Sequence, residues 1–187
     1  FPYTTLFRSR HEIELSDLTK QLIAELQEVR LLIITGGEPL LQQPALIQLV
    51  VVLREYLPSL RVEIETNGTI NPTSRFSELI NLFVVSPKLA NSKQSERRRL
   101  RRSALASFPL DRTVLKFVVT DPQDLSEVQR VLEIAGLPPE RTWIMPEGTT
   151  PDGMAVGLRA LADPANRLGY NLSPRLHILL WENIRAT

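Results

Sequence analysis

The residues best placed to do chemistry in this chain form a glycine-rich turn. Residues 35–39 read Thr-Gly-Gly-Glu-Pro and directly follow a short run of Leu and Ile. Because glycine has no Cβ, the backbone at Gly36 and Gly37 can approach a ligand closely. Pro39 favours an extended Glu38, whose carboxylate joins the bare carbonyls. Such an acceptor-rich pocket suits a ligand ammonium group, although the same turn can also serve only to connect a strand to a helix.

Polar residues close other apolar runs further along the chain. Glu65 and Asn67 close the second run, Ser-Pro-Lys at 86–88 closes the third, and Met-Pro-Glu-Gly at 145–148 closes the fifth. If these runs are parallel strands, their carboxyl ends meet at one edge of the sheet, where such folds bind their ligands. The sequence therefore predicts one shared pocket.

Helical patterns alternate with the apolar runs. Ser16 is a candidate N-cap for a first helix, which has Leu18, Leu22, Leu26 and Val29 on one face. Pro44 suits the first turn of a second helix. A third helix begins at Asp121-Pro122 and ends at Gly136, and a fourth covers residues 152–168 and ends before Gly169. The apolar runs are rich in Val and Ile and lack clean alternation, which predicts strands buried on both faces. Repeated strand–helix units predict an α/β fold with a parallel sheet and right-handed crossovers.

In this order, the motifs resemble the 7-carboxy-7-deazaguanine synthase family of radical S-adenosylmethionine (SAM) enzymes of queuosine and deazapurine biosynthesis. The resemblance covers about residues 31–185. Gly-Gly-Glu-Pro alone indicates the superfamily, whereas Ser-Pro-Lys, Met-Pro-Glu-Gly and Pro-Arg-Leu-His-Ile-Leu-Leu-Trp indicate this family. The resemblance implies a partial (β/α) radical SAM barrel in a cytoplasmic homodimer. It also implies a carbon-nitrogen lyase that contracts the ring of 6-carboxy-5,6,7,8-tetrahydropterin to 7-carboxy-7-deazaguanine, with loss of ammonia.

The resemblance also assigns residues to ligands. It implies SAM contacts at Gly36, Gly37, Glu38, Ser86, Pro87, Lys88, Met145, Pro146, Glu147 and Gly148. It implies substrate contacts at Thr35, Glu65, Asn67 and His177. Glu65 and Asn67 could bond the ribose or the pterin edge, or simply cap a strand end with an Asn-Gly turn. His177, expected in a C-terminal strand with Arg175, has the alternative of a hydrogen-bonded core histidine. No residue is assigned a catalytic role.

The chain departs from the family in one respect, because it contains no cysteine. The family holds a [4Fe–4S] cluster with three cysteine thiolates, and neither His11 nor His177 could replace them. We therefore expect that the first strand and the cysteine loop, with its Mg²⁺ ligand, are missing, and we predict no metal ligand in this chain. We interpret residues 1–10 as a non-native or disordered leader and residues 11–187 as a single partial core domain. A cluster-free SAM- or purine-binding domain with a regulatory role is the alternative.

Composition and the remaining motifs exclude several other classes. The net charge of +1 and the lack of a long apolar stretch argue against nucleic-acid and membrane partners. No dinucleotide fingerprint, P-loop lysine, zinc motif or hydrolase elbow is present. The arginine-rich segment 97–102 lacks interleaved aromatic residues for base stacking. We interpret it as a solvated face or a substrate-covering insert within 91–107, the segment with the strongest prediction of disorder in the middle of the chain.

Overall fold

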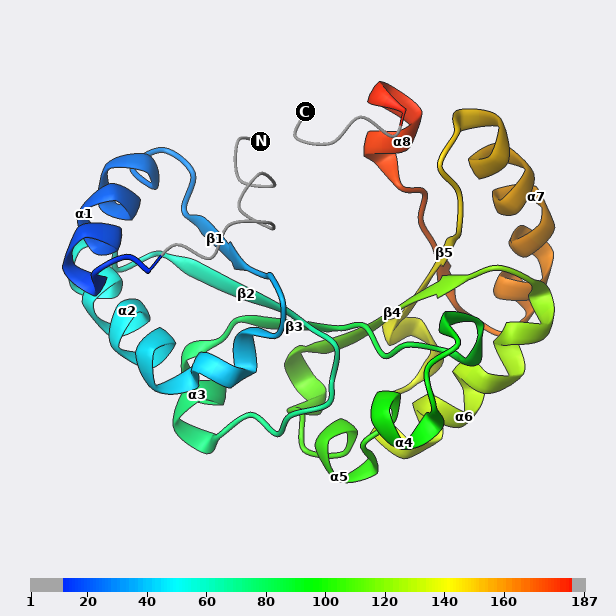
Figure 1. Cartoon of the computed structure of the whole chain (residues 1–187), viewed down its shortest axis with the longest axis horizontal. Helices are drawn as coiled ribbons and strands as arrows, with labels where there is room; N and C mark the ends of the chain where they lie inside the picture. Colours follow the sequence, from blue (N-terminus) through cyan, green and yellow to red (C-terminus); the bar gives the residue numbers. More distant parts are fainter. Residues whose placement is uncertain (1–11, 183–187) are drawn as a thin grey trace.

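The computed structural model describes residues 12–182, which form an α/β fold around one parallel sheet. The strands of this described part are β1 (Leu31–Ile34), β2 (Arg61–Thr66), β3 (Leu82–Val85), β4 (Thr113–Val119), β5 (Thr142–Pro146) and β6 (Asn171–Leu172). All neighbouring pairs are parallel, and the strand order follows the chain order. The sheet curves into an open crescent, the arrangement expected of a partial radical SAM barrel (Figure 1).

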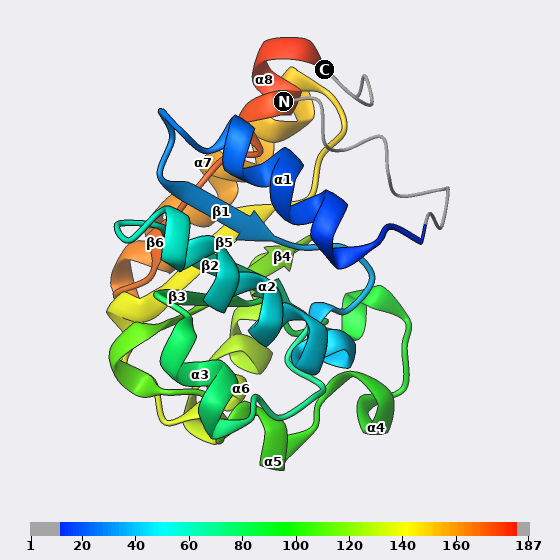
Figure 2. The same ribbon diagram turned by 90° about the vertical axis from the view of Figure 1, so that its left-hand side faces the viewer.

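Helices cover the convex side of the crescent and leave its concave side open (Figure 1). They are α1 (Leu15–Glu25), α2 (Gln43–Tyr56), α3 (Ser74–Leu79), α4 (Glu96–Arg99), α5 (Arg102–Leu105), α6 (Leu125–Ala135) and α7 (Pro151–Arg167). The last helix of the described part, α8 (Leu176–Trp181), lies instead at the open side of the crescent, next to α7 (Figure 1). From the side, α1, α2 and α3 lie next to one another in front of β1, β2 and β3 (Figure 2). Among the described residues, no helix is both long and apolar enough to cross a membrane.

Burial alternates along β2, β3, β4 and β5, which corrects the expectation of burial on both faces. In β4, for example, Leu115 and Phe117 are buried beneath the helices, whereas Lys116 and Val118 on the other face stay partly exposed. The sequence hides this alternation because the concave face also carries apolar residues, such as Val114. Only one face of the described sheet is therefore core, and the other is available to ligands.

An aromatic cluster anchors the middle of the sheet. Phe83 of β3 meets Phe108 edge to face at a centroid distance of 5.4 Å, and Phe76 of α3 at 6.3 Å. Such pairs contribute about 0.5–1.5 kcal/mol beyond their burial. Because Phe83 is fully buried, the cluster holds β3 in place just before the Ser86-Pro87-Lys88 segment.

The helix boundaries follow the sequence at most positions but not at all of them. Pro44 lies in the first turn of α2, and Gly136 ends α6 with a φ of 67°. Ser16 is not the N-cap of α1, since the helix begins at Leu15 after Glu14. Val29 lies beyond the helix and is 62% exposed. The apolar pattern in the sequence continues past the end of α1 because Leu26, the C-cap residue of this helix, is still buried.

Two segments differ more from expectation. The predicted C-terminal strand is instead helix α8, with Arg175 as its N-cap. The arginine-rich segment is folded into α4 and α5, and Ala104, Leu105 and Phe108 are buried in the core. The predicted leader at residues 1–10 lies outside the described residues.

Candidate functional site

The Gly-Gly turn at the end of β1 is open to ligands. Gly36 has a φ of 123°, a conformation that side chains rarely adopt, whereas Gly37 has no such constraint. Apart from the neighbouring residues in the chain, a Cβ built at either glycine would meet no atom of the described residues 12–182 within 4 Å. No packing contact therefore requires a glycine at 37, and the bare backbone forms a cradle that a ligand could fill.

Glu38 ties the end of β1 to the end of β2. Its carboxylate accepts hydrogen bonds from the Thr66 hydroxyl at 2.7 Å and the Asn67 amide at 2.9 Å. It also accepts one from the Leu40 amide at 3.1 Å, which caps the short 3₁₀ helix Pro39–Gln42. The predicted contact between Glu38 and SAM stays a prediction, but these bonds also make Glu38 a residue that positions the turn.

Asn67 adopts the turn geometry that was the alternative to a ligand contact. Its side-chain oxygen accepts hydrogen bonds from the Thr69 amide at 2.9 Å and the Thr69 hydroxyl at 2.6 Å. Gly68 follows with a φ of 74°, and a Cβ there would lie 2.7 Å from Val85. The Asn67 side-chain oxygen is therefore engaged in an Asx turn.

A larger cavity on the concave face brings several predicted residues together. It has a volume of about 410 Å³ and is lined by Glu65, Leu82, Val84, Val114, Lys116, Trp143, Met145 and Ser173. The Thr35 hydroxyl donates to Glu65 Oε2 at 3.3 Å, and Lys116 Nζ lies 3.6 Å from Glu65 Oε1. Lys116 was not predicted as a site residue, although a lone lysine within an apolar strand was a usable signal.

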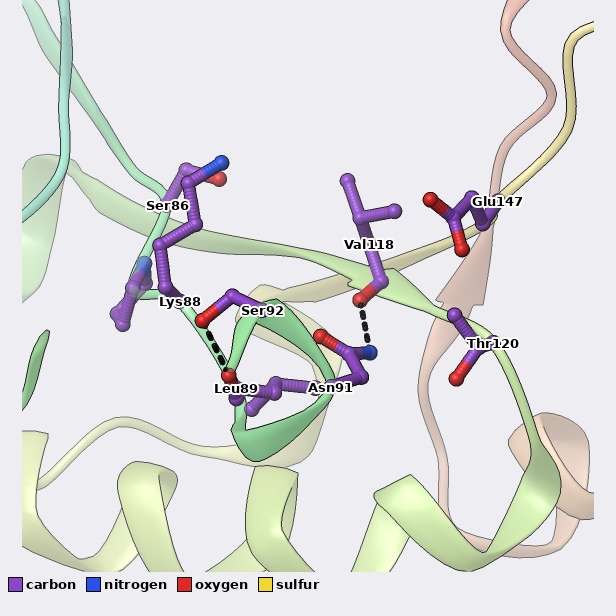
Figure 3. A pocket seen from close by; sticks show the side chains of 9 residues that line it. Ser86, Lys88, Leu89, Asn91, Ser92, Val118, Thr120 and Glu147 are labelled. Carbon is purple, nitrogen blue, oxygen red and sulfur yellow. Dashed lines mark hydrogen bonds between the residues drawn. The ribbon is translucent and has the colours of Figure 1, made fainter. Parts of the chain in front are cut away.

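A smaller cavity joins the two segments predicted to contact SAM. Its volume is about 150 Å³, and its lining includes Ser86, Pro87 and Lys88 after β3 and Glu147 after β5. Figure 3 shows Lys88 and Glu147 on opposite sides of this cavity, with Asn91 between them and Thr120 on the side of Glu147. The Ser-Pro-Lys and Met-Pro-Glu-Gly segments thus converge at the carboxyl ends of the strands.

Asp124 organises one wall of the smaller cavity. One of its carboxylate oxygens accepts hydrogen bonds from the Thr120 amide, the Thr120 hydroxyl and the Asn91 amide group, each at 2.9 Å. Partial burial raises the pKa of Asp124, but these hydrogen bonds outweigh it and hold the pKa below its ordinary value. Sequence reasoning missed this residue, although Asp121 and Asp124 form a capping box that the spacing could have indicated.

Replacing Asp124 with asparagine should lower the free energy of unfolding at pH 7 by about 1–2 kcal/mol, because an amide accepts these bonds poorly. Since the folded pKa lies below the unfolded one, the carboxylate contributes stability above about pH 4 that is lost as the pH falls through the folded pKa. Urea unfolding should show a smaller difference in the free energy of unfolding between variant and wild type near pH 3 than at pH 7. Asp163→Asn, on the exposed surface of α7, is the control, and its free energy of unfolding should equal that of the wild type at both pH values.

Arg99 is a buried anchor rather than part of a solvated face. Its side chain is 4% exposed, and Nη1 lies 2.6 Å from Glu127 Oε1. Nη1 also donates to the Lys88 carbonyl at 3.0 Å, and Nε to the Gln94 carbonyl at 3.3 Å. Glu127 in turn accepts from the Ala90 amide at 2.7 Å. This network holds the loop that carries Lys88, while the neighbouring arginines at 97, 98, 101 and 102 are exposed.

Helix α8 contributes no residue to the lining of either cavity. His177 is exposed on α8 and lines neither of them, so the alternative of a core histidine is wrong and the substrate contact stays a prediction. Arg175 Nη1 donates to the Gly148 carbonyl at 3.2 Å. A Cβ at Gly148 would lie 3.2 Å from the backbone of Met154, so this glycine also serves the close approach of α7.

Fold and site together define the class of this protein. It is an α/β protein of the partial-barrel type, with a glycine-rich turn, a cavity with polar lining at the carboxyl ends of its parallel strands and a more apolar cavity on the concave face of the sheet.

Comparison with known proteins assigns the family. A family profile described as a 4Fe-4S single cluster domain matches residues 2–108. A 7-carboxy-7-deazaguanine synthase of Pyrobaculum aerophilum is 34% identical over 98% of this chain and 79% of its own length. One of Halobacterium salinarum is 35% identical over 89% of this chain and 72% of its own length. The chain belongs to the 7-carboxy-7-deazaguanine synthase family, as its motifs predict.

The residues present do not fit the cluster that the family profile is named for. Such clusters are held by cysteine thiolates, and the sequence contains no cysteine. In the described residues 12–182, no group of three His, Cys, Asp or Glu side chains could hold a metal ion. The chain therefore supplies no site for a [4Fe–4S] cluster, and the SAM contacts of its Gly-Gly turn stay a prediction.

Proposed function

We propose that this chain is the ligand-orienting part of a 7-carboxy-7-deazaguanine synthase. That enzyme contracts the ring of 6-carboxy-5,6,7,8-tetrahydropterin to 7-carboxy-7-deazaguanine, with loss of ammonia. The observation that carries the proposal is the convergence of the Ser86-Pro87-Lys88 segment and Glu147 on one cavity. Family membership supports the same assignment. As part of this proposal, the protein works as a cytoplasmic homodimer without nucleic-acid or membrane partners.

In this proposal, SAM lies along the carboxyl ends of β1, β3 and β5. The exposed backbone of Gly36 and Gly37 accepts hydrogen bonds from the SAM ammonium group. The Lys88 ammonium and the Ser86 hydroxyl reach the methionyl carboxylate and the ribose hydroxyls. Residues 145–148 flank the adenine. Pterin occupies the larger cavity beside Glu65, where Thr35 is within hydrogen-bond distance of the carboxylate.

The chain as it stands orients ligands but does not generate a radical, because it has no cluster ligands. We expect that anaerobic reconstitution with iron and sulfide gives no stoichiometric [4Fe–4S] signal by absorbance or Mössbauer spectroscopy. Joining a cysteine-bearing N-terminal segment typical of the family should restore both the cluster and SAM cleavage. A stable cluster in the unaltered chain would contradict the first expectation, and a restored cluster without pterin conversion would contradict the proposed function.

The absence of cysteine also favours a second candidate, a cluster-free domain that binds SAM or a purine-like ligand and regulates another protein. Calorimetric titration separates the two candidates. An enzyme core should bind both SAM and 6-carboxypterin, a stable oxidised analogue of the substrate. A regulatory domain should bind only SAM or a purine and show no affinity for the pterin.

A further inference from the structure

The ion pair between Glu65 and Lys116 lies on the open face of the sheet. Glu65 belongs to β2 and Lys116 to β4, so the two side chains meet across the intervening strand β3. Their side chains are 42% and 36% exposed, respectively. An ion pair with this exposure contributes at most about 1 kcal/mol to stability. Stability alone is therefore a weak reason for placing two opposite charges on this face.

The surroundings of the pair are those of a binding site for a flat ring. Val84, Val114 and Trp143 line the same cavity and give it an apolar wall. Trp143 is the direct neighbour of Lys116 on β5, so its ring lies beside the lysine on the concave face. Apolar walls with a few convergent polar groups are typical of small-molecule sites, and a cavity of about 300–1,000 Å³ is the usual size.

We propose that Glu65 and Lys116 together recognise the 2-amino-4-oxo edge of a pterin. The Glu65 carboxylate accepts hydrogen bonds from the 2-amino group and N3–H, and the Lys116 ammonium donates one to the adjacent 4-oxo oxygen. The ring lies against Val84, Val114 and Trp143. This assignment rests on the proposed function and adds Lys116 as a residue that determines substrate specificity.

The order of the charges matches the order of the ligand atoms. Along this edge, a pterin presents two donors followed by one acceptor, and the protein presents an acceptor followed by a donor 3.6 Å away. A lumazine carries an oxygen where the pterin carries the 2-amino group. That oxygen would face the Glu65 carboxylate, and a site with an unmatched polar group rejects such a ligand. The site should therefore prefer pterins to lumazines.

Titration calorimetry on the 187-residue protein, with SAM present and absent, tests this proposal with 6-carboxypterin and 6-carboxylumazine as probes. The wild type should bind the pterin at least about tenfold more tightly than the lumazine, as expected for a two-bond contact to one edge. Glu65→Gln should erase this preference, and Lys116→Met should weaken pterin binding by about tenfold. Glu63→Gln is the matched control, because Glu63 lies on the same face of β2 but outside the cavity. This control should bind like the wild type.

Exchanging the two charges separates recognition from a purely structural role. The double variant Glu65→Lys with Lys116→Glu keeps an ion pair but reverses its order, so thermal stability should stay near the wild-type value while pterin preference is lost. A preference for pterin over lumazine as strong as that of the wild type in this double variant would overturn the proposal. So would unchanged preference in Glu65→Gln or unchanged pterin affinity in Lys116→Met. If the wild type binds SAM but no pterin, the proposed function fails, and this assignment fails with it.

Discussion

Replacing Arg99 with alanine is expected to lower the free energy of unfolding by about 3 kcal/mol. The substitution removes a guanidinium that is 4% exposed and leaves the carboxylate of Glu127 with one cationic partner among the described residues, Arg130, beside the Ala90 amide. It also leaves the carbonyls of Lys88 and Gln94 without their donor. Removal of one member of a buried pair is costly because the remaining charge stays desolvated. Urea unfolding followed by circular dichroism measures this loss.

Arg98→Ala is the control for this experiment. Arg98 is the preceding residue in α4 and is exposed, so its loss should change stability by no more than about 0.5 kcal/mol. Because Arg99 holds the Lys88 loop, its replacement should also weaken SAM binding. Equal stability of the two variants would contradict the role assigned to the buried guanidinium.

Gly37→Val is expected to weaken SAM binding by about 2 kcal/mol, roughly thirtyfold, the scale of an overpacking clash. Within the described part of the chain, a Cβ at this position meets no atom within 4 Å beyond the adjacent residues, and Gly37 has no positive φ. The variant should therefore fold as the wild type does, and its defect should appear only when the ligand is present. Calorimetric titration with SAM, on this chain and on the cysteine-restored protein, measures the change.

Gly37→Ala provides a graded comparison, because its single methyl group intrudes less than the valine side chain. We expect an intermediate loss of SAM affinity and an unchanged melting temperature. Wild-type SAM affinity in a correctly folded Gly37→Val protein would remove the Gly-Gly turn from the binding site.

The sequence predicted the parallel sheet and its helices because the relevant signals are local. Pro44 and Gly136 mark helix ends through backbone geometry that needs no tertiary context. Ser16 failed as a cap because serine is tolerated inside a first turn as well as before it. The C-terminal helix was misassigned because a short apolar run such as residues 178–181 suits a helix or a strand equally well.

Parts of the site were not predictable from the sequence because they depend on contacts between distant segments. The bond from Asn91 to Asp124 and the pair of Arg99 with Glu127 join residues that the spacing does not link. Among five arginines in one run, no local feature distinguishes the one that is buried. Lys116 and Glu65 meet because the sheet places β2 and β4 on either side of β3.

The agreement between strand order and chain order bears on how the protein assembles during synthesis. Across the described residues, each strand after β1 pairs with the strand made immediately before it, so none has to wait for a later strand to fill a gap. Every pairing closes a loop of moderate length, which keeps the entropy cost of each step low. At the end of this series, β6 contributes only two residues, too short an edge to template the strand of another molecule. The topology therefore favours growth of the sheet one strand at a time as the polypeptide leaves the ribosome.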